Sequence, residues 1–573
     1  MKQADQPAAS ARVTQLQKRI AAARGSLPSD LVLQNARYLD VFSGAWVTAD
    51  IAIYDGVIVG VEPGRTASRT VDLGGRAVVP GFIDAHVHVE SSLLLPRDFE
   101  REVLPRGTTT AVCDPHELAN VQGVAGIRYF LEQASNLSLD LRVMLSSCVP
   151  ATTFETNGGG VVSASDLSPL KDHERALGLA EVMNVPAVLH GDPSMLDKLV
   201  AFDAHPKDGH CPLLRGADLS AYAVARITSC HESSELEEAR EKLRKGIAVW
   251  IREGSVAKDL DALCPLLTPE SSPFLGFCTD DRNPLDIAHE GHLDYLVRRA
   301  IAKGAHAPSV YRAVSHSVAR HYGLAGSSVA NPVGAIAPGY RADLVVLDDM
   351  MTCQIHAVYK SGVRTDELPF LSAGMAPPEN SIRAAIPAES DLMGPTGMVH
   401  VIGVREGRIL TDRHVLPHDH ASVVRISVLE RYGHGGKPAN AYATGFGKLG
   451  GAIASSVGHD SHNLIVVGSN VRDMRAALAA LAEMGGGFAV VRDGSVVASL
   501  PLAFGGLMST EGPEAVVQGL TELRAASAAI GCELKEPFLQ LAFLSLPVIP
   551  SLKLTDRGLM DVDKFELISV RAA

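Results

Sequence analysis

Residues 80–92 read PGFIDAHVHVESS, and this segment decides the fold. After Pro80 and Gly81, a short apolar run leads into His86-Val-His88, a pattern typical of a buried strand. Residues two apart in a strand point to the same side, so both imidazoles face the same way and can share a metal ion. An isolated H-x-H pair is more often two ordinary histidines, so its interpretation depends on the surrounding sequence.

The sequence that follows repeats the pattern of a short apolar run and then a helical stretch. Eight strands alternating with helices over about 250 residues are typical of a (β/α)8 TIM-type barrel, an α/β fold whose active sites lie at the carboxyl ends of the strands. The weakest strand prediction is KLVAFDAH, because this stretch carries extra polar residues. The eight runs between residues 80 and 330 are FIDAHVHV, TTAVCDP, RVMLSSCV, GLAEVM, KLVAFDAH, AVARITSCH, GIAVWI and FLGFCTD.

Further histidines and carboxylates stand at the ends of these predicted strands. A carboxylate alone at such a position usually caps the next helix. Here a barrel would gather six side chains around one mouth, and mixed imidazole and carboxylate ligands suit Zn, Fe(II) or Mn(II) better than Ca or Cu(I). Six ligands exceed one tetrahedral site, so two ions bridged by a carboxylate are expected. The six candidates are His86, His88, Glu181, His210, His231 and Asp280.

The segments on either side of the barrel predict further units. Residues 30–79 and 331–365 contain short Val- and Ile-rich runs broken by turns, which favours one small β-domain that is discontinuous in sequence. The helix VRDMRAALAALAEM is predicted to be capped by Asn470 and ended by Gly485. The predicted division is an N-terminal helical segment (1–29), the β-domain (30–79 plus 331–365), the catalytic barrel (80–330), a linker (366–395) and a C-terminal α+β domain (396–573).

Composition narrows the classes of function. The chain of 573 residues has a formal net charge of −13, which disfavours binding to nucleic acid phosphates. Its eight cysteines form no C-x-x-C motif, so reduced thiols in a cytoplasmic protein are the simplest interpretation. No secretory signal is visible, and no run of about 18 apolar residues predicts a membrane span.

Seven segments resemble the adenine deaminase family of the amidohydrolase superfamily, and they extend over nearly the whole chain after residue 30. The resemblance implies a metal-dependent barrel, a β-domain built from the flanking segments, and the hydrolysis of adenine to hypoxanthine and ammonia in purine salvage. The segments are PGFIDAHVHVESS (80–92), CDPHELANV (113–121), GLAEVMNVP (178–186), DGHCPLLRG (208–216), FCTDDRNPLDIAHEGHLD (277–294), GHDSHNLIVVGSN (458–470) and LSLPVIPSLKLTDRGL (544–559).

The resemblance also implies roles for the metal ligands. His86 and His88 match the first-strand ligands, and Glu181 matches a carboxylate that bridges two metals where many other amidohydrolases use a modified lysine. His210 and His231 match the ligands of the second ion. The ions implied are two divalent transition metals, Mn or Fe, with Zn as a third candidate.

Catalytic roles follow from the same comparison and from the chemistry. Asp280 matches the strand-eight aspartate that binds metal and moves protons. A metal lowers the pKa of water towards about 7, and the resulting hydroxide would attack C6 of adenine while Asp280 carries the proton. Glu117 and His116 could bind or protonate the purine, or could simply form a capping pair at a strand–helix junction. The residues that bind the purine ring stay unknown.

The sequence departs from the family pattern at two places. Cys230 stands before His231, where the family often has aspartate, and His205 competes with His210 around strand five. We prefer His210 because its G-H-x-P-x-L setting resembles the family. His459, Asp460 and His462 lie near the mouth or in a loop of the C-terminal domain, and the sequence does not decide between these positions.

Two other functions are alternatives for a barrel of this kind. A cyclic-amide hydrolase of the hydantoinase or dihydroorotase type would use the same barrel, but such enzymes usually carry lysine at the position of Glu181. A binding protein that had lost activity would not need competent residues at all six ligand positions. We therefore expect a small purine base as the partner, and neither nucleic acid nor a membrane. We also expect a homo-oligomer, namely a dimer, although no residue pattern specifies it.

Overall fold

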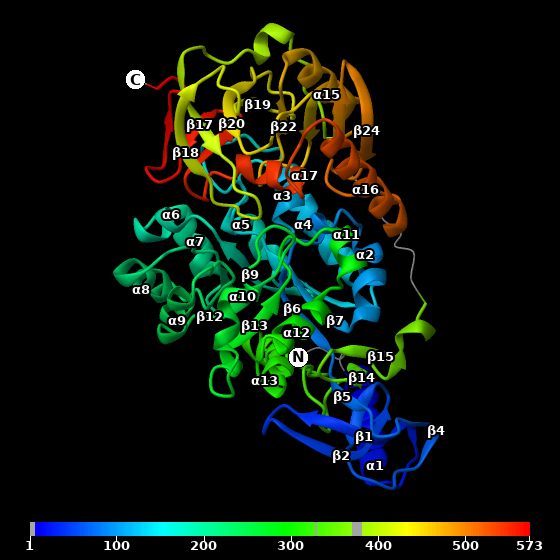
Figure 1. Cartoon of the computed structure of the whole chain (residues 1–573). Helices are drawn as coiled ribbons and strands as arrows, with labels where there is room; N and C mark the ends of the chain where they lie inside the picture. The colour runs from blue at the N-terminus through cyan, green and yellow to red at the C-terminus, as the bar shows by residue number, and fades with distance from the viewer. Residues whose placement is uncertain (1–5, 327–328, 370–380, 573) are drawn as a thin grey trace.

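A parallel eight-stranded barrel forms the middle of the molecule in the computed structural model, which describes residues 6–326, 329–369 and 381–572 (Figure 1). The strands are short and almost entirely buried, as expected where helices cover the outside of a parallel sheet. They are β6 (Phe82–Val87), β7 (Thr108–Cys113), β8 (Asp140–Leu145), β9 (Ala176–Val182), β10 (Lys207–Gly209), β11 (Ser229–Cys230), β12 (Ala248–Arg252) and β13 (Leu275–Cys278).

The barrel closes at two joints between hydrogen-bonded sheets. Strands β6 to β10 form one sheet and β11 to β13 form another. At the first joint, the Thr228 amide donates to the Lys207 carbonyl over 3.0 Å. At the second joint, Val87 pairs with Asp280 in parallel register, so the chain just beyond β13 closes against β6. The predicted α/β barrel fold is therefore present.

Strand five lies further along the chain than the sequence predicted. The stretch KLVAFDAH (198–205) was expected to be a strand, but its first four residues end helix α7 (Pro193–Ala201). Asp192 caps this helix by accepting from the Met195 amide, and Lys198 and Leu199 are buried on one side of it. The actual strand is the three-residue β10, which is too short to give a period-two signal.

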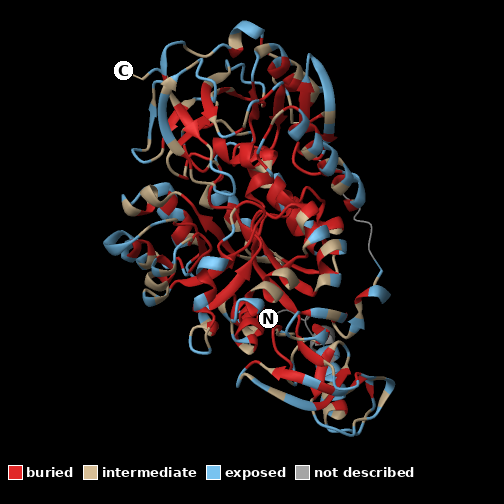
Figure 2. Cartoon of the chain, viewed as in Figure 1, coloured by how far each residue is buried: buried red, intermediate tan, exposed pale blue. Residues whose placement is uncertain are grey.

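Helices follow the barrel strands and cover their outer surface. Figure 2 shows the strands buried and the solvent-facing sides of these helices exposed. Their bounds are α2 (Pro96–Val103), α3 (His116–Gln122), α4 (Val124–Ala134), α5 (Ala164–Leu167), α6 (Val185–Leu189), α7 (Pro193–Ala201), α8 (Gly216–Val224), α9 (Leu236–Arg244), α10 (Leu260–Leu263), α11 (Pro284–His289), α12 (Leu293–Ala302), α13 (Ala307–Arg312) and α14 (Val318–His321).

A small β-domain lies at one end of the barrel, with helix α1 (Gln6–Ala23) packed on it (Figure 1). Its sheet runs β16-β15-β14-β5-β1-β2-β3, with β4 beside β1, so it combines strands from before and after the barrel. The strands are β1 (Ser29–Asp40), β2 (Ala45–Tyr54), β3 (Val57–Gly60), β4 (Ala67–Asp72), β5 (Ala77–Pro80), β14 (Leu344–Asp349), β15 (Gln354–Lys360) and β16 (Val363–Arg364).

The C-terminal domain lies at the opposite end of the barrel. Its large sheet has the order β18-β17-β20-β19-β22-β21-β23-β24, and β25, β26 and β27 form a second sheet. The strands are β17 (Met398–Gly403), β18 (Asp412–Pro417), β19 (Val424–Leu429), β20 (Ala439–Thr444), β21 (Ala452–Ser455), β22 (Leu464–Gly468), β23 (Gly487–Arg492), β24 (Ser495–Pro501), β25 (Leu552–Thr555), β26 (Gly558–Asp561) and β27 (Glu566–Ile568), and the helices are α15 (Val471–Met484), α16 (Pro513–Ala529) and α17 (Pro537–Ala542).

Three other features bear on the sequence predictions. Residues 370–380 of the predicted linker lie outside the described residues. All eight cysteines are free thiols and buried. Within the part of the chain that the structure describes, no helix is both long and apolar enough to cross a membrane.

Candidate metal centre

The six predicted metal ligands converge at the carboxyl-terminal mouth of the barrel. Each follows or ends a strand, and all six are at least 94% buried. The strand ends place them because parallel strands of a barrel bring their carboxyl ends to one face. His86 and His88 belong to the end of β6, Glu181 to β9, His210 and His231 to the residues after β10 and β11, and Asp280 to the residues after β13.

Glu181 lies between two pairs of imidazoles. Its Oε1 atom is 3.6 Å from His86 Nε2 and 3.3 Å from His88 Nε2. Its Oε2 atom is 2.6 Å from His210 Nδ1 and 3.4 Å from His231 Nε2. Burial would raise the pKa of this carboxyl, but His210 and His231 hold it well below its usual range. One carboxylate therefore offers an oxygen to each pair.

Asp280 lies beside the first pair, and the ligand atoms of His86, His231 and Asp280 also lie within 4.8 Å of one another. Its Oδ1 atom is 3.5 Å from His86 Nε2 and 3.3 Å from His88 Nε2. Its backbone has φ = 53°, in the left-handed region that aspartate tolerates better than most residues. The Asp280 amide donates to the His86 carbonyl over 3.0 Å, and the His88 amide donates to the Asp280 carbonyl over 3.2 Å. These bonds fix the carboxylate next to both imidazoles.

The donor set fits divalent transition metals. His86 Nε2 and His88 Nε2 are only 3.0 Å apart and aim at a common point. The ligand atoms of His86, His88 and Glu181 lie within 4.8 Å of one another, as do those of Glu181, His210 and His231. Buried imidazole nitrogens and carboxylates gathered this closely suit Zn, Fe(II) or Mn(II). Two such groups that share Glu181 can hold two neighbouring ions.

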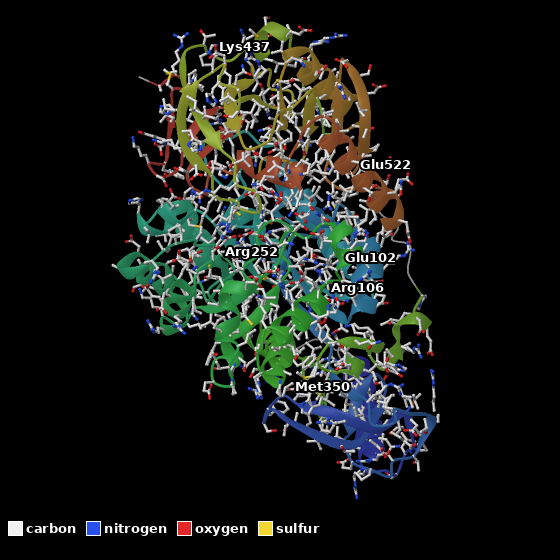
Figure 3. All side chains as sticks on the ribbon, in the orientation of Figure 1. Glu102, Arg106, Arg252, Met350, Lys437 and Glu522 are labelled. Atoms are coloured by element: carbon white, nitrogen blue, oxygen red, sulfur yellow. The ribbon has the colours of Figure 1, made fainter. Side chains whose placement is uncertain are left out.

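Arg252 forms an ion pair with the second carboxylate oxygen of Asp280. It is the last residue of β12, in the barrel, where Figure 3 labels it. It is 2% exposed, and its guanidinium Nη1 is 3.3 Å from Asp280 Oδ2. The same guanidinium pairs with Glu232 and with Asp259. Burial would raise the pKa of the Asp280 carboxyl, but His86, His88 and Arg252 hold it well below its usual range. Sequence reasoning missed Arg252, although its place at a strand end was a usable signal.

Glu117 and His116 begin helix α3 at the same mouth. His116 Nδ1 lies 3.0 Å from Asp114 Oδ2, and Glu117 Oε1 lies 2.6 Å from His459 Nδ1. The other Glu117 oxygen contacts His462 Nε2. His459 and His462 therefore lie at the barrel mouth, which settles the position that the sequence left open. Burial lowers the pKa of His459, but Glu117 opposes this, and the net pKa is raised to about 9.

The C-terminal domain supplies one wall of the cavity above the metal ligands. The cavity encloses about 320 Å³, including space open to solvent. Met183 of the barrel contributes to it, and Phe543 stacks on the His459 ring with centroids 4.6 Å apart. The sequence analysis missed Met183, Ile409, Phe543 and Leu546, because no periodic pattern marks the loops that carry them. The domain's contributions are Ile409, His459, Asp460, Phe543 and Leu546.

His205 and Cys230 lie outside this cavity. His205 packs against the Phe202 ring at 5.7 Å and does not join the ligand cluster, whereas His210 does. Cys230 is buried, and its Sγ lies 3.5 Å from Cys211 Sγ and 3.4 Å from Lys242 Nζ. The Cys230 thiol therefore contacts Cys211 and Lys242 and takes no part in the ligand cluster.

Comparisons with known proteins find family matches to both large units of the chain. The amidohydrolase family model matches residues 77–366, and the model of the adenine deaminase C-terminal domain matches residues 404–566. A curated adenine deaminase of Brucella suis biovar 1 (strain 1330) is 48% identical over 558 residues, covering 95% of each chain. Another, from Cereibacter sphaeroides (strain ATCC 17025 / ATH 2.4.3), is 50% identical over 560 residues, covering 95% of this chain and 98% of the relative.

A barrel with buried imidazoles and carboxylates at its mouth and a match to this family model defines an amidohydrolase, a class that implies divalent metal ions. Within that class, the chain belongs to the adenine deaminase family.

Proposed function

We propose that this protein hydrolyses adenine to hypoxanthine and ammonia, a reaction of purine salvage. One observation carries the proposal: Glu181 joins two imidazole pairs beside Asp280, in a chain about half identical to curated adenine deaminases over nearly its full length. Glutamate at the bridging position argues against the cyclic-amide hydrolases, which usually carry lysine there. The complete ligand set argues against an inactive binding protein.

The metal centre would hold two ions. His86, His88 and Asp280 would bind the first, His210 and His231 the second, and Glu181 both. We propose Mn or Fe as the metal, with Zn as a third candidate, because mixed imidazole and carboxylate ligands suit all three. When bound, such ions supply hydroxide near neutral pH by lowering the pKa of water.

We propose Asp280 as the proton carrier. Hydrolysis forms a bond from water oxygen to C6 of adenine and breaks the bond from C6 to the amino nitrogen, which leaves as ammonia. The water must lose a proton and the amino group must gain one. The Asp280 carboxylate lies within the ligand cluster, with Oδ1 3.3 Å from His88 Nε2, where it could accept the proton from water and pass it to the amino group.

Glu117, His116 and His459 line the same cavity and can orient the base. Adenine presents ring nitrogens that accept hydrogen bonds, and an imidazolium at position 459 can donate one. Glu117 holds that imidazolium in place through its 2.6 Å contact with His459 Nδ1. We propose these residues as the groups that bind or protonate the purine. The apolar Phe543 and Leu546 would then cover the rest of the ring.

The proposal extends to the setting of the enzyme. We propose a cytoplasmic homodimer that acts on a free purine base. The net charge of −13 supports the absence of a nucleic acid partner, because phosphate contacts require clustered positive charge.

Ammonia release from a panel of purines tests the proposal, with bound metal measured on the same samples. Adenine should be turned over, and adenosine should not, because we propose that the C-terminal domain, which supplies one wall of the cavity, closes the site over the base and excludes ribose. Equal turnover of adenosine would exclude this account of the pocket. Absence of ammonia from adenine with metal-loaded enzyme would exclude the function.

A further inference from the structure

Lys553 is a buried ammonium group that the chemistry at the metal centre leaves without a role. It lies in β25 and is 0% exposed. Among the residues that the structure describes, no carboxylate lies within 4 Å of its Nζ atom. Burial lowers its pKa to about 7. Placing a cation there is costly, so its contacts need an explanation.

Both contacts of this ammonium are carbonyls of residues that line the metal cavity. Lys553 Nζ donates to the Ile409 carbonyl over 2.7 Å and to the Phe543 carbonyl over 2.9 Å. Ile409 lies in the connection between β17 and β18, and Phe543 follows α17. The two residues are 134 positions apart in sequence, and the one side chain joins their backbones.

Ile409, Phe543 and Leu546 cover the metal ligands on the side of the C-terminal domain. We call these three residues the apolar roof. They belong to one hydrophobic cluster, in which Phe543 and Leu546 are 5% and 4% exposed. The Phe543 ring also stacks on His459. The roof therefore meets both the cavity and the histidine proposed to contact the base.

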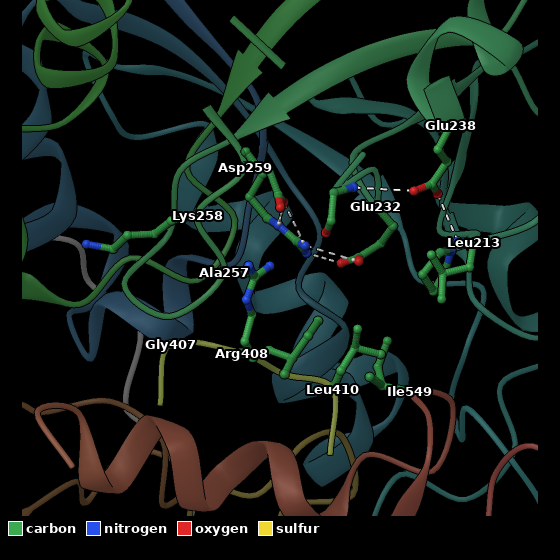
Figure 4. A pocket seen from close by; sticks show the side chains of 14 residues that line it. Leu213, Glu232, Glu238, Ala257, Lys258, Asp259, Gly407, Arg408, Leu410 and Ile549 are labelled. Atoms are coloured by element: carbon green, nitrogen blue, oxygen red, sulfur yellow. Dashed lines mark hydrogen bonds and ion pairs between the residues drawn. The ribbon is translucent and has the colours of Figure 1, made fainter. Parts of the chain in front are cut away.

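Other bonds hold the Ile409 connection at its two ends. Gln540 Nε2 donates to the Arg408 carbonyl over 2.7 Å, and Thr411 Oγ1 donates to the Leu552 carbonyl over 2.9 Å. Figure 4 shows Arg408 and Leu410 across from Glu232 in an outer cavity of about 490 Å³, including open solvent. Ile409 lines both the outer and the metal cavity. Its backbone position thus sets the boundary between them.

We infer that Lys553 is a positioning residue for the purine base, because its ammonium fixes the backbones of Ile409 and Phe543 and so holds the apolar roof in place. This inference rests on the proposed function. A roof that packs on the flat face of the base contacts substrate and transition state alike. Its loosening should therefore raise KM more than it lowers kcat.

A lysine elsewhere in the chain provides a matched control. Lys360 is also buried, and its Nζ donates to the Thr109 carbonyl over 2.8 Å. Its carboxylate partner is Asp343, at 2.8 Å, and it lies in the small β-domain sheet at the other end of the barrel. Loss of this ammonium should lower stability without reaching the roof.

The test compares Lys553→Met and Lys360→Met in the full-length, metal-loaded enzyme. For Lys553→Met we expect KM for adenine to rise about tenfold or more, the scale of a lost charged hydrogen bond, with kcat within about twofold and metal content unchanged. Hydrogen exchange at the amides of residues 405–411 and 541–547 should become faster. For Lys360→Met we expect a lower melting temperature and an unchanged KM.

The outcomes separate this inference from the proposed function. If the parent enzyme does not release ammonia from adenine, the proposed function fails, and the exchange measurement still decides whether Lys553 holds the roof. If Lys553→Met folds with parental KM, or exchanges its roof amides at the parental rate, the inference is overturned. If that variant does not fold, Lys553→Gln and Ile409→Ala take its place, and a parental KM in both overturns it equally.

Discussion

At the scale of single residues, the site depends on which oxygen or nitrogen faces which neighbour. Glu181 directs its two oxygens to different imidazole pairs, whereas Asp280 directs one oxygen to His86 and His88 and the other to Arg252. The first arrangement suits a bridge between ions. The second arrangement suits a group that both binds a metal ion and exchanges a proton. One carboxylate oxygen can stay in contact with its neighbours while the other accepts or donates the proton.

Asp280→Asn tests the proton-transfer role. The carboxamide can still offer an oxygen to the metal, but it cannot accept the proton. We expect kcat to fall at least about a hundredfold, within the usual range for general acid–base catalysis, with adenine binding kept within about tenfold. Steady-state rates should be normalised to bound metal. A normalised kcat within a few-fold of the parent would transfer the role to another group, of which Glu117 is the next candidate.

Glu155 gives a prediction about pH. Burial, together with the nearby charge of Asp460, raises the pKa of this carboxyl from 4.5 to about 8. The folded state therefore keeps a proton that the unfolded state has lost, and stability falls as pH rises from about 4.5 to 8. Glu155→Gln keeps a neutral side chain at every pH. We expect equal melting temperatures at pH 5 and a higher one for the variant at pH 9, and a variant less stable at pH 9 would contradict this.

The sequence predicted the metal ligands at the ends of the barrel strands. It did not predict the cavity residues that distant parts of the chain contribute. His86 and His88 could be located because strand periodicity is local, and the remaining ligands because barrel strands share one mouth. Arg252 also ends a strand, but its contacts with Asp280, Glu232 and Asp259 depend on the three-dimensional arrangement, which the strand-end position alone does not specify. Ile409 and Phe543 reach the cavity only through long-range packing, which one sequence does not reveal.

At the scale of elements, the sequence predicted the boundaries of a helix correctly where capping residues mark both of its ends. Helix α15 begins after Asn470 and ends before Gly485, whose φ of 75° is the left-handed conformation that favours glycine. Both predicted boundaries are confirmed. The strand expected at KLVAFDAH was wrong because a helix with a good cap at Asp192 covers its apolar residues, while the true strand has only three residues.

Asn470→Ala tests the cap itself. Asn470 Oδ1 accepts from the Asp473 amide over 2.8 Å, and alanine would leave that amide without its partner. We expect a loss of about 1 kcal/mol in the free energy of unfolding of the C-terminal domain, seen as a lower urea midpoint. Asn470→Ser should retain most of the stability. Activity should not change, because no residue of α15 lines the metal cavity, and an Ala variant as stable as the parent would refute the capping role.

At the scale of the whole molecule, the barrel and the C-terminal domain share one hydrophobic core. A single cluster of buried residues contains both Leu118 of the barrel and Phe504 of the C-terminal domain. The Tyr129 and Phe504 rings are 4.7 Å apart, and the Ser509 amide donates to the Leu93 carbonyl over 2.8 Å. The two units are therefore continuous in their packing.

Truncation tests this continuity. A fragment of residues 1–369 would expose the barrel surface that the C-terminal domain now covers, and large exposed apolar patches promote aggregation. We expect the fragment to be insoluble or aggregated in size-exclusion chromatography and to lack deaminase activity, under conditions where the full chain is soluble. A monodisperse fragment with the helical content of the barrel would show that the shared core is dispensable.

The pairing of Asp280 with the strand that carries His86 and His88 has a consequence for heat inactivation. The backbone bonds that shut the cylinder are also the bonds that set the acid–base group against the first ligand pair. If these backbone hydrogen bonds break even briefly, Asp280 moves away from His86 and His88 while the rest of the chain is still folded. Catalysis should therefore fade on warming before the global melting transition, and reinforcing this one seam should extend the working temperature more than reinforcing any other joint of the cylinder.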